Sequence, residues 1–249
     1  METKKILYVD DDPEIREALR LLLLHLGDVQ SMVFVNHRES VERVAAFLRQ
    51  AGAEVSAFHG GMEQRDRERA LYRFANGSAN VLVSTDLAAR GLDIEHVASV
   101  IHYHLPLNDE AFTHRNGRAT RWDRSGEAWV IVGPDEQFAP TGVQFDTQTD
   151  THALAAETAH RAMPTPRWTT LYIGKGKKDK VNRVDVVGFL TKVGGLQRDE
   201  LGRIDVADHF AFAAVARHRV HEVLSRVRGQ KIKGQRTIVE VERAARGAT

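Results

Sequence analysis

Short β-type apolar runs alternate with stretches of helical periodicity between residues 28 and 133, and this rhythm constrains the fold more than any other feature. The runs lie at 31–35, 55–58, 81–84, 98–103 and 128–132. A helix around Val41, Val44 and Leu48 follows the first run and stops at Gly52. Strand, helix, strand in this order predicts an α/β fold with a mostly parallel sheet flanked by helices. Ligands of such sheets collect at the carboxyl ends of the strands.

The rest of the chain predicts a second, smaller α+β domain. Residues 137–166, rich in Thr, Gln, Asp and Pro, indicate a linker with one short alanine-rich helix within 153–162. Residues 167–243 then read strand, helix, strand, strand, helix and strand, a βαββαβ order, before a tail at 244–249. The predicted domains are therefore 1–136 and 167–243.

Charge is distributed unevenly along the chain. Residues 1–165 hold 17 Lys and Arg against 25 Asp and Glu, net −8, whereas residues 166–249 hold 18 against 9, net +9, in agreement with the overall +1. The basic end is the candidate for nucleic-acid binding. The absence of cysteine excludes disulfides and thiolate metal sites, and the sequence has neither a signal-peptide layout nor an apolar run of about 18 residues. We expect a cytoplasmic protein with no membrane partner and no metal site of its own.

Two segments that follow predicted strands carry the chemistry. Thr85 and Asp86 can cap a short helix, and the free N–H groups of a helix start bind phosphate; an ordinary helix cap is the alternative. In the segment 114–121, one histidine and three arginines stand at positions i, i+1, i+4 and i+7, so Arg118 and Arg121 share a helical face. Guanidinium forks suit the oxygens of a transferring phosphoryl group; a solvated basic turn is the alternative.

These segments resemble, in order and spacing, motifs of the second RecA-like lobe of DEAD-box ATP-dependent RNA helicases over residues 31–135. The matching segments are 33–36, 59–67, 84–93 and 114–121. The resemblance implies that Arg118 and Arg121 contact the γ-phosphate of ATP across a cleft between two lobes. It also implies that Gly91 and Asp93 belong to the nucleotide site, where Asp93 accepts a hydrogen bond from the ribose, and that His114 helps to join the lobes.

The same resemblance implies a surface that holds the RNA sugar-phosphate backbone without reading the bases. Its residues would be Arg38, Gly60, Gln64, Arg67 and Thr85. Solvated helix positions are the alternative for Gln64 and Arg67.

Two parts of a complete helicase are missing from the sequence. It contains no G-x-x-x-x-G-K-[ST] loop for the phosphates and no Asp-Glu-Ala-Asp segment for magnesium and the attacking water. ATP and Mg²⁺ are therefore expected only when a first RecA-like lobe completes the site. Alone, the chain is predicted to be inactive as an ATPase.

Residues 4–27 resemble the opening strand and helix of a response-regulator receiver domain. In that family an acidic pair, here Asp10 and Asp11, binds magnesium beside a phosphorylated aspartate. The stretch 55–59, where that aspartate would stand, contains none. Because helicase second lobes also begin with a strand and a helix, residues 1–28 are predicted to replace that strand and helix structurally.

The basic domain resembles the RNA-binding domain of DbpA-type helicases, a relative of the RRM fold. Tyr172 on the first predicted strand, and Phe210 and Phe212 on the third, would offer rings for base stacking. The third-strand signature is only partly present, since Asp208 and His209 replace Lys/Arg-Gly, and burial of the two phenylalanines in the core is the alternative.

Four lysines on a glycine-containing loop are predicted to meet RNA phosphates in a salt-dependent way. They are Lys175, Lys177, Lys178 and Lys180. The DbpA resemblance further implies a structured element of large-subunit ribosomal RNA as the target, and a role in ribosome assembly. The favoured hypothesis is the C-terminal part of a DbpA-type helicase; a non-catalytic RNA-binding protein and a receiver–helicase chimera are the alternatives.

Overall fold

The computed structural model describes residues 3–8, 15–89, 94, 97–119, 126–133, 136, 143, 145 and 147–242. Contacts between Cα atoms divide these residues into two compact units. The first unit holds 3–67 and 80–165, and the second holds 68–79 and 166–242. No helix in the described part of the chain is long and apolar enough to cross a membrane.

The first unit is built on a seven-stranded sheet with the order β3-β4-β2-β5-β6-β1-β7, in which every neighbouring pair is parallel. The strands are β1 (Thr3–Tyr8), β2 (Ser31–Val35), β3 (Val55–Phe58), β4 (Val81–Thr85), β5 (Ser99–His102), β6 (Glu127–Val132) and β7 (Thr147–Asp150). Five of them coincide with the apolar runs, and the predicted parallel sheet is confirmed.

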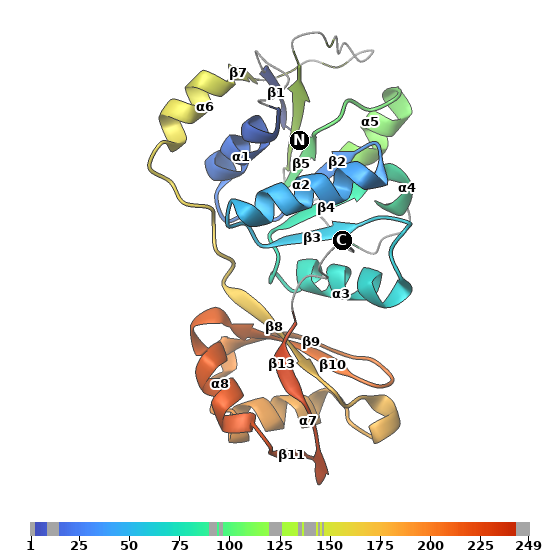
Figure 1. Cartoon of the computed structure of the whole chain (residues 1–249), viewed down its shortest axis with the longest axis vertical. Coiled ribbons are helices and arrows are strands. Elements are labelled where there is room, and N and C mark those ends of the chain that lie inside the picture. The colour runs from blue at the N-terminus through green and yellow to red at the C-terminus, as the bar shows by residue number, and fades with distance from the viewer. Residues whose placement is uncertain are drawn as a thin grey trace. The chain divides into compact units, whose positions relative to one another are not determined.

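Helices flank this sheet (Figure 1). They are α1 (Ile15–Leu26), α2 (Arg38–Gln50), α4 (Asp86–Ala89), α5 (Asp109–Asn116) and α6 (Thr151–Thr158). A further helix, α3 (Gln64–Ala75), begins in the first unit and continues into residues assigned to the second. The apolar residues of α2 recur at helical spacing and bury Val41, Val44 and Leu48 in the main core of the unit. Alternate residues of β6 face opposite sides, so Ile131 lies in that core whereas Val130 and Val132 pack with Phe112 of α5.

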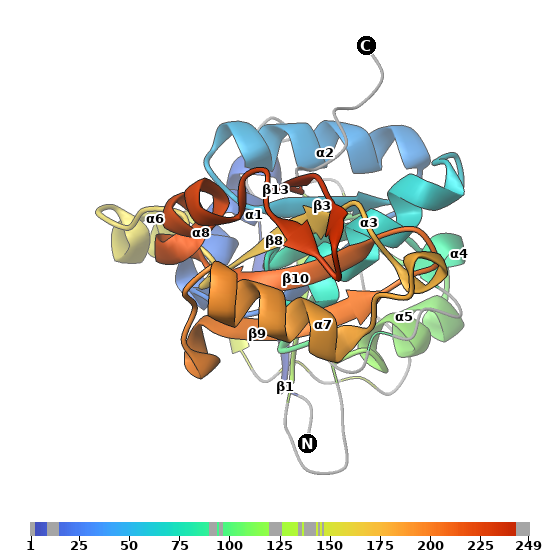
Figure 2. The same ribbon diagram turned by 90° about the horizontal axis from the view of Figure 1, so that it is seen from below.

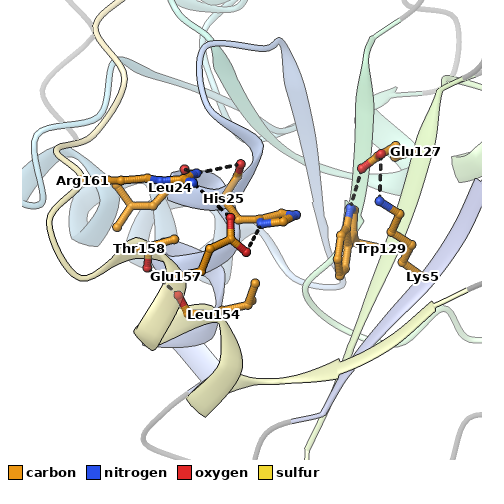
Figure 3. A network of polar contacts seen from close by, with 9 residues as sticks. All are labelled: Lys5, Leu24, His25, Glu127, Trp129, Leu154, Glu157, Thr158 and Arg161. Atoms are coloured by element: carbon orange, nitrogen blue, oxygen red, sulfur yellow. Dashed lines mark hydrogen bonds and ion pairs between the residues drawn. The ribbon is translucent and has the colours of Figure 1, made fainter.

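The N-terminal strand and helix are part of the lobe. β1 pairs with β6 on one edge and with β7 on the other. Lys5 of β1 donates to Glu127 at 2.8 Å, and the Trp129 indole N–H donates to the same carboxylate at 3.1 Å (Figure 3). On the helix side, His25 lies 2.8 Å from Glu157 of α6 (Figure 3). β1 is thus a strand of the sheet and α1 packs in the main core, whereas Asp10 and Asp11 lie outside the described residues.

The segment 137–166, which was predicted to be a linker with one helix, contains a strand as well as that helix. Its alanine-rich part is indeed a short helix, α6, but β7 precedes it and forms an edge strand of the sheet. Leu154 of α6 is 3% exposed and belongs to the main core. β7 reads Thr-Gln-Thr-Asp, which has no apolar alternation, so only its pairing with β1 makes it a strand.

The second unit contains a four-stranded antiparallel sheet with the order β13-β8-β10-β9. Its strands are β8 (Trp168–Ile173), β9 (Leu201–Val206), β10 (Ala211–Ala216) and β13 (Val239–Val241). The helices α7 (Arg183–Gly188), continued by η3 (Phe189–Val193), and α8 (Val220–Val227) lie across one face of this sheet (Figure 2). The element order matches the predicted βαββαβ, with an added hairpin of β11 (Lys231–Ile232) and β12 (Gln235–Arg236).

Candidate nucleotide and RNA sites

A buried arginine joins the carboxyl ends of three strands in the first unit. Arg115, 1% exposed, donates from Nε and Nη2 to the two carboxylate oxygens of Asp86, each at 2.6 Å. It also donates to the backbone oxygen of His104 at 2.7 Å and to Asn36 Oδ1 at 2.9 Å, and its guanidinium lies 5.2 Å from the centre of the Phe34 ring. This bidentate ion pair fixes α5, with the arginine segment at its end, to the segments that follow β2, β4 and β5.

A buried histidine holds the next residue of the segment. His102 Nε2 lies 2.7 Å from Asn116 Oδ1, and His102 is fully buried between Phe34 and Phe112. Burial, and then the positive charge of Arg115, lower the pKa of His102 to about 3. The ring is therefore neutral at pH 7, and a hydrogen on Nε2 can be donated to the amide oxygen. Sequence reasoning missed Arg115 and His102 because their partners are distant in the chain.

The predicted finger arginine lies beside a cavity. Arg118 donates from Nη2 to the backbone oxygen of Ala89, the last residue of α4, at 3.1 Å. His114 is largely exposed and lies 3.8 Å from Glu110. A cavity of about 290 Å³ is lined by Phe34, Asp86, Ala89, Ala111, His114, Arg115 and Arg118. Arg118 and His114 are thus brought together as predicted residues of one site.

Three other residues that were predicted to contact the nucleotide lie outside the described residues; they are Gly91, Asp93 and Arg121. Within the described part, Asp86 is already paired with Arg115, and there is no group of three or more His, Cys, Asp or Glu side chains that could hold a metal ion. Arg118 and His114 both line the cavity, and the planar donors of a guanidinium suit phosphate oxygens.

The predicted RNA-backbone residues of the first unit follow the carboxyl ends of β2, β3 and β4. Arg38 is exposed and pairs with Glu39 at 2.7 Å. Its Cδ would lie 3.6 Å from a Cβ placed on Gly61, so the turn containing Gly60 lies beside it. Gln64 is exposed at the start of α3, and Thr85 is half-buried at the end of β4.

Arg67 is half-buried, because its guanidinium stacks 5.1 Å from the centre of the Phe58 ring. Such stacking fixes the direction of the side chain. Arg67 is therefore held against the end of β3, which differs from a freely solvated helix position.

The three aromatic residues predicted in the basic domain lie together. The ring centres of Tyr172 and Phe210 are 5.7 Å apart, and those of Phe210 and Phe212 are 5.0 Å apart. Phe212, at 1% exposure, is buried, and Tyr72 of the same unit lies 4.9 Å from it. Tyr172 and Phe210 keep part of their surface exposed. Phe212 is therefore a buried residue, whereas base stacking by the two partly exposed rings stays a prediction.

The predicted lysine loop is an ordered turn. Lys175 pairs with Asp179 at 2.8 Å, which fixes the turn η2 (Lys177–Asp179). Lys177, Lys178 and Lys180 are exposed, and Lys178 lies 3.9 Å from Asp208. Because Lys175 holds the turn, the other three lysines are the better candidates for phosphate contacts.

The two units match known families separately. Residues 14–123 match the helicase conserved C-terminal domain, and residues 170–241 match the DbpA RNA binding domain. The first match begins before α1, so this helix belongs to the helicase domain.

Curated relatives match across most of the chain, 87% and 82% of its length in two cases. The ATP-dependent RNA helicase DbpA of Escherichia coli is 36% identical over 224 residues, which cover 87% of this chain and 47% of that protein. DbpA of Bacillus subtilis is 29% identical over 227 residues and is again covered to 47%. The chain thus spans about half the length of these curated relatives.

Solved structures match the first unit. They include the E. coli DEAD-box protein SrmB, with a TM-score of 0.55 and 33% identity over 62% of this chain and 94% of that one. Saccharomyces cerevisiae Dbp5 bound to RNA and ADP BeF3 matches with a TM-score of 0.55 and 25% identity over 64% of this chain and 44% of that one. The chain therefore combines a helicase conserved C-terminal domain with a DbpA RNA binding domain, and it is similar to the C-terminal region of DbpA-type DEAD-box RNA helicases.

Proposed function

We propose that this chain supplies one wall of the ATP site of an RNA helicase and also binds the RNA. The observation that carries the proposal is the cavity at the end of α5, where Arg118 and His114 lie together on a helix fixed by the Arg115–Asp86 ion pair. When bound, ATP with Mg²⁺ would supply the transferable phosphoryl group. Arg118 and Arg121 would then hold the γ-phosphate, His114 would contact the first lobe, and Gly91 and Asp93 would hold the nucleoside.

The RNA path in the first unit would follow the ends of β2, β3 and β4. The residues concerned are Arg38, Gly60, Gln64, Arg67 and Thr85. The Dbp5 structure of similar fold is bound to RNA, which supports this assignment. Backbone contacts of this kind position the strand without reading its sequence.

The RNA-binding domain would anchor the chain to structured RNA, with large-subunit ribosomal RNA and ribosome assembly as the proposed setting. The match to the DbpA RNA binding domain and the exposed lysines on its first loop support this proposal. Tyr172 and Phe210 would add base stacking.

Reconstitution with a separately produced first lobe tests the enzymatic part. The chain alone should show no ATPase activity, and the mixture should show RNA-stimulated hydrolysis. Because an arginine finger contributes about 10³ to 10⁵ in rate, Arg118→Ala should reduce kcat by about 10³-fold.

Arg198→Ala in the second unit is the matched control, since Arg198 is exposed and far from the cavity in sequence. It should leave kcat unchanged. Hydrolysis by the chain alone, or full activity of Arg118→Ala in the mixture, would contradict the proposal. Absence of reconstitution together with tight RNA binding would favour the non-catalytic RNA-binding protein.

A further inference from the structure

The hairpin of β11 and β12 projects from the second unit (Figure 1). Its two turn residues, Lys233 and Gly234, have φ angles of 50° and 78°, as a tight two-residue hairpin turn requires. Ile232 is 2% exposed and packs into the core of the unit. The hairpin is therefore anchored from beneath.

The side-chain contacts of Lys233 account for a lysine at this position, where the positive φ angle disfavours residues other than glycine. Its Nζ donates to the backbone oxygen of Lys180 at 2.6 Å and lies 2.9 Å from Asp185. Gln235 donates to the backbone oxygen of Asp179 at 3.1 Å. These contacts join the hairpin to the end of the lysine turn and to the start of α7.

The remaining cations of the hairpin form an unfavourable arrangement. Lys231 and Arg236 are directly opposite each other across the two strands, and both are exposed. Since Ile232 points into the core, its neighbours in the strand point away from it. Like charges directly opposite on a sheet are destabilising, and within the described residues neither side chain has an ion-pair partner.

Nearby carboxylates do not neutralise this pair. Asp179 is bound by Lys175 at 2.8 Å, and Asp185 is bound by Lys233. Lys180, whose backbone contacts the hairpin, is itself exposed and has no ion pair in the described part of the chain. Asp179 and Asp185 are thus occupied by the lysines that hold the fold, and Lys180, Lys231 and Arg236 are exposed to solvent, where they can meet an anion.

We propose that Lys231 and Arg236 form a clamp for the sugar-phosphate backbone of RNA, extended by Lys180. This inference rests on the proposed RNA binding and assigns a contact surface apart from the rings of Tyr172 and Phe210. The clamp contributes affinity through phosphate charge and not through base identity.

Titration of the full chain with a fluorescently labelled RNA stem-loop, at several salt concentrations, tests the clamp. The double variant Lys231→Gln/Arg236→Gln should bind roughly tenfold more weakly at low salt, and the slope of log K against log salt should fall by about 2. Changing the loop sequence should leave this loss unaltered. Because two facing like charges are removed, the thermal midpoint should stay level or rise.

Lys192→Gln/Arg198→Gln is the matched control. It removes the same charge from exposed residues, with Lys192 at the far end of the helix that begins beside the hairpin. The exchange Lys231→Arg/Arg236→Lys keeps both charges and should bind as the unmodified chain does.

Equal losses of RNA affinity in the Lys231→Gln/Arg236→Gln variant and in the control would overturn the proposed clamp, while the proposed RNA binding by the chain would still stand. A loss in the exchange variant as large as in the Gln variant would also overturn it. No binding by the unmodified chain would overturn the proposed function itself. Equal competition by polyglutamate at matched charge would assign the hairpin to an acidic polypeptide instead of RNA.

Discussion

Arg115 illustrates how a single residue can control the geometry of the candidate site. Its guanidinium is buried, and among its hydrogen-bond partners in the described part of the chain only Asp86 carries a negative charge. Asp86→Asn should lower the free energy of unfolding by about 3 kcal/mol, because it leaves a buried cation without its counter-charge. Urea denaturation measures this change. The control Glu110→Gln, which alters the exposed pair of Glu110 and His114, should change the free energy of unfolding by less than about 0.5 kcal/mol. Equal effects of the two substitutions would contradict this account.

His102 should make the first unit sensitive to acid. Its pKa is lowered in the folded state to about 3, whereas an unfolded histidine titrates near 6.5. The unfolded state therefore binds the extra proton, so the contribution is fully present above about pH 6.5 and is lost as pH falls from there toward 3. Between these two pH values, the contribution of His102 to the free energy of unfolding changes with a slope that approaches about 1.4 kcal/mol per pH unit.

The variant His102→Asn keeps a donor for Asn116 and removes this titration. The stability difference between pH 7.5 and pH 5 should be smaller in the variant than in the unmodified chain. Substitution of the exposed His221 by Asn is the control. This variant should show the same stability difference between pH 7.5 and pH 5 as the unmodified chain. An unchanged acid sensitivity in His102→Asn would rule out the buried ring as its source.

At the level of elements, β7 and α6 hold the N-terminal strand and helix in place. Leu154→Ala should destabilise the chain by about 2 to 5 kcal/mol, since it opens a cavity in the main core. Glu157→Ala, which removes exposed contacts to His25 and Arg161, should cost no more than about 1 kcal/mol. Thermal unfolding compares the two. A larger effect of Glu157→Ala would show that polar contacts, and not packing, join α6 to α1.

The uneven charge of the entire chain predicts where RNA affinity lies. Residues 1–165 carry net −8 and residues 166–249 carry net +9. RNA binding should therefore weaken steeply with salt in the full chain, and a chain ending at residue 165 should lose most of both the affinity and the salt dependence. Filter binding at several salt concentrations measures both quantities. Retention of the full salt slope by the shortened chain would place the main phosphate contacts in the first unit.

Much of the fold was accessible from local patterns. Apolar runs and their spacing predicted five strands of the parallel sheet, the helix α2 and the βαββαβ order of the second unit. This was possible because the periodicities of strands and helices can be recognised in consecutive residues. The segment 114–121 also stood out by its own spacing. It helped to carry the helicase resemblance, which the match of residues 14–123 supports.

Other features depended on residues that meet only in the folded chain. β7 has no apolar alternation and becomes a strand by pairing with β1, more than 130 residues earlier. The partners of Arg115 and His102 come from different strands and helices, so no local spacing marks them. The facing cations Lys231 and Arg236 depend on the register of a hairpin. Local sequence therefore determines most of the elements, whereas long-range pairing and burial add β7 and decide which side chains share a site and which of them remain available to a ligand.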